Sequence, residues 1–125
     1  MHIPDFIGRQ FYVEGSLRNR VDGFELQAQN PLGAGTLVGI GTLRVDGREV
    51  DTAALTAQRE GDEEVISAAE VSAYNPIRVA KGDRVTLRVA GERLAPGDHL
   101  LQVELYEVNL GLLSFALSDR IADSG

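Results

Sequence analysis

Glycines that could cradle a phosphate are the first chemical signal in this sequence. Four of them lie within nine residues, at positions 33, 35, 39 and 41. A dinucleotide-binding loop needs its glycines between a strand and a helix, because the pyrophosphate rests on the helix N-terminus. Here the glycines run into TLRV at 42–45 and a hairpin turn, and the Gly-Lys-Ser/Thr of a P-loop is absent. The pattern therefore favours a turn followed by a glycine-interrupted, bulged strand, with an interaction loop as the open alternative.

Histidine and the acidic residues give the second signal. His99 follows the turn Pro96-Gly97-Asp98, and we expect its ring to bond turn backbone as a strand begins. A ligand or acid–base role is the less favoured alternative, and Arg18 is the other member of a possible polar site. The sequence has no His-x-His or His-Glu-x-x-His spacing, and the acidic run at 60–64 lacks EF-hand spacing. We therefore expect this chain to bind no metal or other cofactor itself.

Composition narrows the class of protein. The 125 residues suit one domain, 1–125, with 1–10 and 120–125 expected to be loosely ordered tails. The absence of cysteine excludes thiolate catalysis, and a net charge of −7 disfavours nucleic-acid binding. The N-terminus lacks the pattern of a signal peptide, and the apolar runs are too short to cross a membrane. We expect a soluble, cytoplasmic protein without membrane contact.

The elements that must position these residues show alternation of period two. Apolar and polar side chains alternate in FELQA, TLRV, RVTLRV, HLLQVELYEV and LLSFALS, at 24–28, 42–45, 84–89, 99–108 and 112–118. Turn residues separate them, and VDGREV at 45–50 predicts a hairpin. The fold class is therefore all-β: a single antiparallel β-sandwich of Ig or jelly-roll type with at most one short helix. Helix is a candidate at 52–58 and 63–73, although at 68–74 we favour strand over helix because the surroundings are β.

Five short strings carry a resemblance to a known family. In order along the chain they are SLRN at 16–19, GF at 23–24, L-x-VDG at 43–47, KGD at 81–83 and L-x-PG-x-H at 94–99. Over residues 16–105 they resemble the small β subunit of bacterial C-glycoside deglycosidases. The resemblance implies a non-catalytic β-sandwich that assembles with a TIM-barrel α subunit in a hetero-oligomer. The α subunit would carry the base and a divalent metal, usually Mn²⁺, and the complex would cleave the C–C bond of a 3-oxo-C-glycoside by elimination.

The sequence also departs from that family's pattern. It has no tryptophan, and a Pro-Tyr-Tyr-Arg-Gly-like string is replaced by Asn30, Pro31 and Leu32. These residues, together with Tyr74, Asn75 and Pro76, are the candidates for loops that face the partner or the substrate. Turn initiation by asparagine before proline is an equally open interpretation of both loops.

Two further functions stay open. One is a stand-alone β-sandwich that binds a carbohydrate or another small ligand, and the other is a self-assembling structural module. Stacking on sugars needs aromatic platforms, and the chain has only seven aromatic residues. The stretch at 109–117 has more apolar side chains than one inward face of a strand requires. We therefore expect Leu110 and Leu112 to contact a partner chain, or a second copy in a homo-oligomer.

Overall fold

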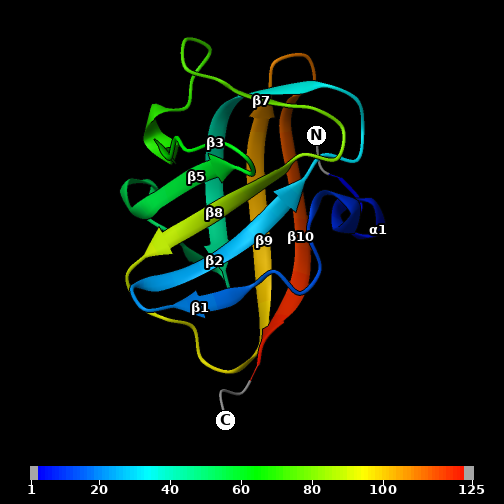
Figure 1. Cartoon of the computed structure of the whole chain (residues 1–125). Helices are drawn as coiled ribbons and strands as arrows, with labels where there is room; N and C mark the ends of the chain where they lie inside the picture. Colours follow the sequence, from blue (N-terminus) through cyan, green and yellow to red (C-terminus); the bar gives the residue numbers. More distant parts are fainter. Residues whose placement is uncertain (1–2, 123–125) are drawn as a thin grey trace.

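Two antiparallel sheets pack across one core in the computed structural model, which describes residues 3–122 (Figure 1). The sheet that lies in front in Figure 1, the β2 sheet, has the order β1-β2-β8-β5-β6. Its strands cross those of the β9 sheet, which has the order β10-β9-β3-β4 with β7 also paired to β3. The strands are β1 (Arg18–Arg20), β2 (Gly23–Gln29), β3 (Gly35–Val45), β4 (Arg48–Glu49), β5 (Leu55–Arg59), β6 (Ile66–Ser67), β7 (Ile77–Val79), β8 (Arg84–Ala90), β9 (Gly97–Glu107) and β10 (Gly111–Ile121). The helical turns are α1 (Asp5–Gly8), η1 (Arg9–Phe11), η2 (Thr52–Ala54) and η3 (Ala68–Glu70).

The alternating stretches form the core, as the sequence predicts. In β8, Val85, Leu87 and Val89 are buried, and the inward positions of β2, β3, β9 and β10 follow the same period. Burying a side chain of this size stabilises a fold by roughly 1.5–3 kcal/mol before the entropy of ordering is subtracted. The predicted antiparallel β-sandwich is confirmed.

The hairpin predicted around Asp46 is also present. Strands β3 and β4 pair with Val45 opposite Arg48, which leaves Asp46 and Gly47 as a two-residue loop. Both loop residues have positive φ, 53° and 81°, as a type I′ turn requires. Asparagine, aspartate and glycine tolerate this conformation better than other residues, so the sequence DG sets the turn.

The helix considered as a candidate at 52–58 does not form. The chain makes one 3-10 turn, η2, which the Asp51 carboxylate caps by accepting a hydrogen bond from the N–H of Ala53 at 3.0 Å. It then enters strand β5, where Leu55 and Ala57 are buried opposite Val89 and Leu87 of β8. Sheet pairing therefore prevails over the modest helix propensity of this alanine-rich stretch.

The prediction of strand at 68–74 is wrong. Strand β6 ends at Ser67, and the turn η3 follows immediately. Ala68 and Val71 are both buried, and their spacing of three suits a helical turn rather than a strand. A tight turn closes at Ser72, whose hydroxyl accepts a hydrogen bond from the N–H of Tyr74 at 3.2 Å. The helix considered for this region is reduced to the single turn.

The N-terminal segment covers part of the long edge strand β10. The N–H of Ile3 donates to the carbonyl of Ser114 at 2.7 Å, and Ile3 is buried. Gly8 of α1 lies so close to β10 that an added Cβ would come within 2.8 Å of the Phe115 Cβ. Covering an edge in this way protects it from pairing with another chain. Ile3 and α1, which belong to the expected tail at 1–10, thus lie against β10.

Candidate functional site

An apolar pocket opens between the two sheets, at the end of the sandwich where the loop at 30–35 and the β9–β10 turn meet. Its volume is about 270 Å³. The deeper walls are aliphatic side chains from both sheets: Leu37, Ile40, Val85, Leu87, Leu105 and Leu113. Phe11 adds one aromatic wall, and its ring stacks on Phe115 at a centroid distance of 5.9 Å.

The sizes of the inward side chains explain why the pocket exists. Along β2 the inward positions carry Phe24, Leu26 and Ala28, so the smallest side chain lies at the pocket end. Across from it, the register of β3 on β9 shifts on both sides of the stretch from Gly39 to Ile40. Such bulges bend a strand locally. A small residue on one sheet and a bent strand on the other leave space that the core does not fill.

Asn30 holds the loop at the pocket mouth. Its Nδ2 donates to the carbonyls of Gly33 at 2.7 Å and Val79 at 3.3 Å, while its Oδ1 accepts from the N–H of Leu32 at 3.1 Å. Side-chain bonds of this kind replace the backbone pairing that a loop lacks. Leu32 and Leu110, which are 52% and 47% exposed, line the mouth. The mouth is thus both ordered and apolar.

Carboxylates give the mouth a negative charge. Glu107 accepts hydrogen bonds from three backbone N–H groups, those of Thr36 at 2.9 Å, Asn109 at 2.8 Å and Leu110 at 3.0 Å. The bond from Thr36, followed by the others, lowers the pKa of Glu107 against the opposing effect of burial, so this group is ionised at neutral pH. Asp83 also lines the pocket, but it pairs with Arg59 at 3.6 Å, so Glu107 is the main source of negative charge. The described lining residues include no Lys, Arg or His. An anionic ligand would therefore be disfavoured here.

The remaining glycines of the opening motif have a packing role. A Cβ added to Gly39 would lie 3.1 Å from the Tyr106 ring, and one added to Gly41 would lie 2.9 Å from the Glu104 Cβ. These two positions are glycine because side chains of the neighbouring strand β9 lie across them. The glycines lead into a bulged strand and not a helix, which confirms the interpretation that rejected a phosphate loop.

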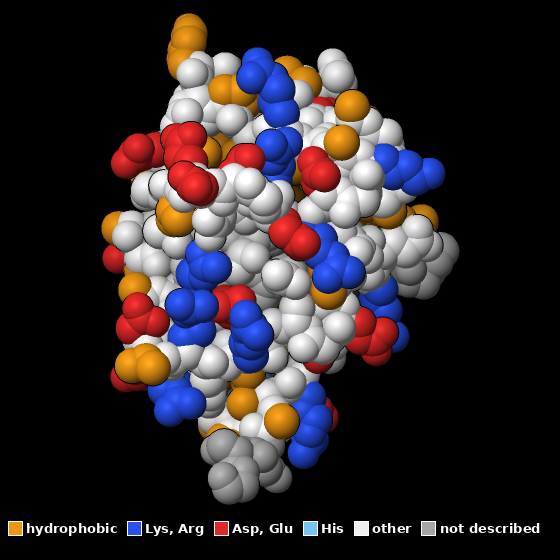
Figure 2. All heavy atoms as spheres, in the orientation of Figure 1, with side chains coloured by type: hydrophobic (Ala, Val, Ile, Leu, Met, Phe, Trp, Pro, Cys, Tyr) orange, Lys and Arg blue, Asp and Glu red, His pale blue; other side chains and the backbone are white. Residues whose placement is uncertain are grey.

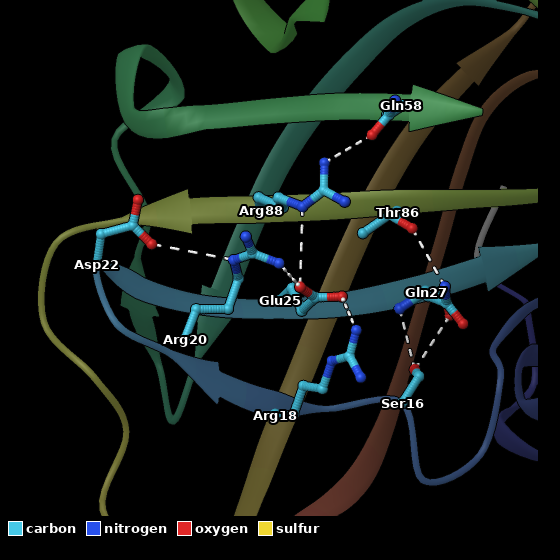
Figure 3. A network of polar contacts seen from close by, with 9 residues as sticks. All are labelled: Ser16, Arg18, Arg20, Asp22, Glu25, Gln27, Gln58, Thr86 and Arg88. Atoms are coloured by element: carbon cyan, nitrogen blue, oxygen red, sulfur yellow. Dashed lines mark hydrogen bonds and ion pairs between the residues drawn. The ribbon is translucent and has the colours of Figure 1, made fainter. Parts of the chain in front are cut away.

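Three arginines surround a buried carboxylate on the outer face of the β2 sheet (Figure 3). The Glu25 side chain is 2% exposed, and it bonds Arg18 at 3.1 Å and Arg20, with Arg88 Nε at 3.8 Å. Burial opposes ionisation of Glu25, but the bond from Arg20 and the charge of Arg18 outweigh it, so the pKa of Glu25 is lowered. Figure 2 shows a group of Lys or Arg side chains over β1, β2 and β8, besides others elsewhere on this face. Sequence reasoning missed this cluster, although Arg18 and Arg20 share one face of a strand by their spacing.

His99 forms a structural pair at the opposite end of β9 from the pocket. Its Nδ1 lies 2.6 Å from Asp46 Oδ2, and its Nε2 lies 2.7 Å from the carbonyl of Ala95. Both partners are acceptors, so both ring nitrogens must carry protons and the ring is an imidazolium. The pKa of His99 is raised, mainly by the hydrogen bond to the Ala95 carbonyl. Burial opposes this shift, and the Asp46 carboxylate adds to it. His99 and Arg18 do not bond each other: Arg18 bonds Glu25, and the histidine ring bonds turn backbone.

The two Asn-Pro loops lie in different places. Asn30, Pro31 and Leu32 form the loop at the mouth of the apolar pocket. Asn75 and Pro76 line a separate hollow together with Arg59, Asp62 and Glu64, and Tyr74 is fully exposed. A shared site for the two loops is therefore absent from the described residues, and contact of either loop with a partner stays a prediction. Leu110 is exposed and Leu112 is half-buried.

Comparison with known proteins identifies the family. The family model described as hydroxymethylglutaryl-CoA reductase, N-terminal domain, matches residues 7–122, which is most of the chain. The chain belongs to this family. No curated protein matches it.

This match corrects the resemblance drawn from the short strings. The chain is not a C-glycoside deglycosidase β subunit, because the family model covers the strings on which that resemblance rested. Strings such as VDG and PG-x-H are turns that many β-sandwiches share, so their order along the chain was weak evidence. The elimination reaction, the TIM-barrel partner and its Mn²⁺ lose their basis with the resemblance, and no comparison tests them.

Within residues 3–122 no group of three or more His, Cys, Asp or Glu side chains is arranged to hold a metal ion. Within the same residues no helix has the length and apolar character needed to cross a membrane.

Proposed function

We propose that this member of the hydroxymethylglutaryl-CoA reductase N-terminal domain family binds a small apolar molecule in the pocket between its sheets. The observation that carries the proposal is the pocket itself, about 270 Å³ of space with aliphatic walls and an ordered mouth. Apolar ligand sites in proteins have volumes of roughly 300–1,000 Å³, and an apolar cavity of about 150 Å³ is enough to bind benzene. A ligand larger than one aromatic ring therefore fits.

The energetic cost of unfilled space supports this proposal. At about 24 cal/mol per Å³, a sealed void of 270 Å³ would cost roughly 6 kcal/mol, which is comparable to the whole stability of a small domain. The mouth is open, so water lowers this cost, but water finds few partners against aliphatic walls. A bound apolar ligand restores the missing contacts and removes apolar surface from water.

The lining residues define the class of ligand. A single aromatic side chain, Phe11, among the described lining residues offers little for stacking on a sugar, so the carbohydrate-binding alternative is not favoured. Glu107 and Asp83 lie at the mouth, and the ionised Glu107 repels a carboxylate or sulfonate on the ligand. We therefore propose a ligand whose polar end is neutral or cationic.

Two fluorescent probes of similar shape test both parts of the proposal. N-phenylnaphthylamine is neutral, whereas anilinonaphthalene sulfonate carries an anionic group on nearly the same skeleton. We expect saturable binding of the neutral probe and at least tenfold weaker binding of the sulfonate. Ala28→Phe fills the pocket from β2 and should weaken binding of the neutral probe at least tenfold. Ala53→Phe, at an exposed position of η2, is the matched control and should leave binding unchanged.

Two results would overturn the proposal. Equal affinity of the native domain and Ala28→Phe would place the probe elsewhere. Preference for the sulfonate would contradict the role assigned to the acidic mouth. Circular dichroism on both alanine variants shows whether a loss of binding reflects a filled pocket or a failure to fold.

The family match favours a second candidate function. The family is described as a domain of a reductase, so we infer that the chain accompanies a catalytic domain that supplies the redox chemistry. The glycine stretch of this chain leads into strand β3 and offers no helix N-terminus for a dinucleotide. The chain alone should therefore fail to reduce hydroxymethylglutaryl-CoA with a reduced dinucleotide, and measurable turnover would contradict this inference. A cytoplasmic location is likewise a proposal, based on the cysteine-free sequence, and cell fractionation tests it.

A further inference from the structure

A second cleft lies on the flank of the molecule, where β1, the loop at 91–96 and the end of β10 meet. Its volume is about 490 Å³, and its described lining residues include three arginines, Arg18, Arg93 and Arg120, but no aspartate or glutamate. Leu17, Leu94, Pro96 and Ile121 supply the apolar part of the lining. A concentration of positive charge of this kind is unexpected on a chain whose net charge is −7.

The wall of this cleft is fixed by a paired hydrogen bond. The Asn19 side chain donates from Nδ2 to the carbonyl of Leu94 at 2.8 Å and accepts at Oδ1 from the N–H of Leu94, also at 2.8 Å. These two bonds hold the loop at 91–96 against the edge strand β1. The backbone next to Arg18 and Arg93 is therefore fixed before any ligand arrives, which reduces the entropic cost of binding.

Buried and exposed carboxylates orient two of the arginines without neutralising the cleft. Glu25 lies outside the lining and bonds Arg18 through one nitrogen, Nη2, at 3.1 Å. A guanidinium has five N–H donors in a planar fork, so Arg18 keeps donors for a second acceptor. The Arg120 Nη1 lies 3.6 Å from the exposed Asp98 carboxylate, an ion pair that solvent screens strongly. Asp119 also lies outside the lining, and its carboxylate accepts from the N–H groups of Gly15 and Leu17 in the cleft wall. Arg93 forms no ion pair within the described residues, so the lining keeps an excess of positive charge.

We propose that this cleft binds a small organic anion through its phosphate or carboxylate group. Paired guanidinium donors match the geometry of both oxyanions, and charge-assisted bonds of this type are among the strongest that side chains make. The apolar residues, Leu94 and Ile121 among them, accommodate a short hydrocarbon part of the same molecule. This site is separate from the apolar pocket, and the two share no lining residue.

Calorimetric titration at low ionic strength with inorganic pyrophosphate and with citrate tests the proposal. We expect saturable binding of at least one of the two, and a preference between them identifies phosphate or carboxylate as the group recognised. The double variant Arg93→Gln, Arg120→Gln should weaken binding at least tenfold, because it removes two of the three cationic side chains. The control is Arg48→Gln, Arg78→Gln, which removes the same charge from exposed positions that do not line the cleft.

The control separates a site from general electrostatic attraction. Binding that survives in the control and is lost in the cleft variant supports the proposal. Equal weakening in both double variants would overturn it, since the anion would then respond to net charge alone. Failure of both anions to bind the native domain would also overturn it. None of these outcomes depends on the apolar pocket, which Ala28→Phe tests independently.

Discussion

Replacing His99 by glutamine should destabilise the fold in a pH-dependent way. The imidazolium of His99 joins the β3–β4 turn, through Asp46, to the loop that precedes β9, through the carbonyl of Ala95. Glutamine has no charge at any pH and cannot donate to both partners with the same geometry. The variant therefore removes one charge-assisted pair and one backbone contact from the end of the sandwich.

The size of the effect follows from exposure. Hydrogen bonds to charged groups contribute about 1.5–3 kcal/mol when they are buried. His99 is buried but the Asp46 side chain is 50% exposed, so solvent screens the pair, and we expect a loss of about 1–2 kcal/mol in the free energy of unfolding. For a domain of this size that corresponds to a fall of roughly 3–8 °C in Tm.

The sign of the pH dependence comes from two pKa shifts. The pKa of His99 is raised above its ordinary 6.5, so its contribution is complete below that pH and is lost as pH rises through the folded value. The pKa of Asp46 is lowered below its ordinary 3.8, so its contribution is lost only as pH falls through that lower value. The difference between native protein and His99→Gln should therefore be largest between about pH 4 and 6.5. Urea denaturation at pH 5, 7 and 9 measures it, and a difference that stays constant over this range would refute the imidazolium assignment.

Two further predictions concern the packing between sheets and within the β9 sheet. Asp119→Ala should lower the free energy of unfolding by about 2–3 kcal/mol, because one carboxylate oxygen accepts hydrogen bonds from the Tyr12 hydroxyl and from two backbone N–H groups. A loss below about 0.5 kcal/mol on urea denaturation would contradict this. Gly41→Ala should cost about 1–3 kcal/mol, because its Cβ would lie 2.9 Å from the Glu104 Cβ. Gly33→Ala, in open space without positive φ, should change stability by less than about 0.5 kcal/mol, and equal urea midpoints for the two glycine variants would contradict the packing argument.

The sequence predicts the strands well where one face is buried and the other is not. Val85, Leu87 and Val89 alternate with polar residues, and only the extended conformation puts all three on one face. The turn at Asp46 and Gly47 could also be predicted from the sequence, because few residue pairs adopt positive φ at two successive positions. The prediction of strand at 68–74 was wrong because the two buried residues there, Ala68 and Val71, are three positions apart, whereas the buried residues of a strand are two apart.

The candidate sites depended on contacts that sequence does not contain. The apolar pocket arises where Ala28 faces a bulged β3, and neither the facing pair nor the bulge follows from alternation. Glu25 occupies an outward position of β2, where a solvated side chain is expected, yet it is almost completely buried. Arg18, Arg20 and Arg88 surround it, and long charged side chains often cover neighbouring groups with their aliphatic stems. The hairpin at 20–23 places Arg18 opposite Glu25, and that geometry was a signal that hairpin rules could have supplied.

The hydrogen bonds of His99 and Asp119 and the apolar pocket lie at opposite ends of β9 and β10. One end can therefore stabilise the fold while the other leaves room for a ligand. Asp119 lies opposite His99 in the β9–β10 register, and both hold polar partners at that end. Leu105, in the pocket wall, lies six residues further along β9, about 20 Å away at 3.3–3.4 Å per residue. Sites this far apart without shared partners usually contribute independently to stability and binding. His99→Gln should therefore lower the Tm while leaving the affinity for N-phenylnaphthylamine unchanged, whereas coupled losses would mean that the sheets open and close as one unit.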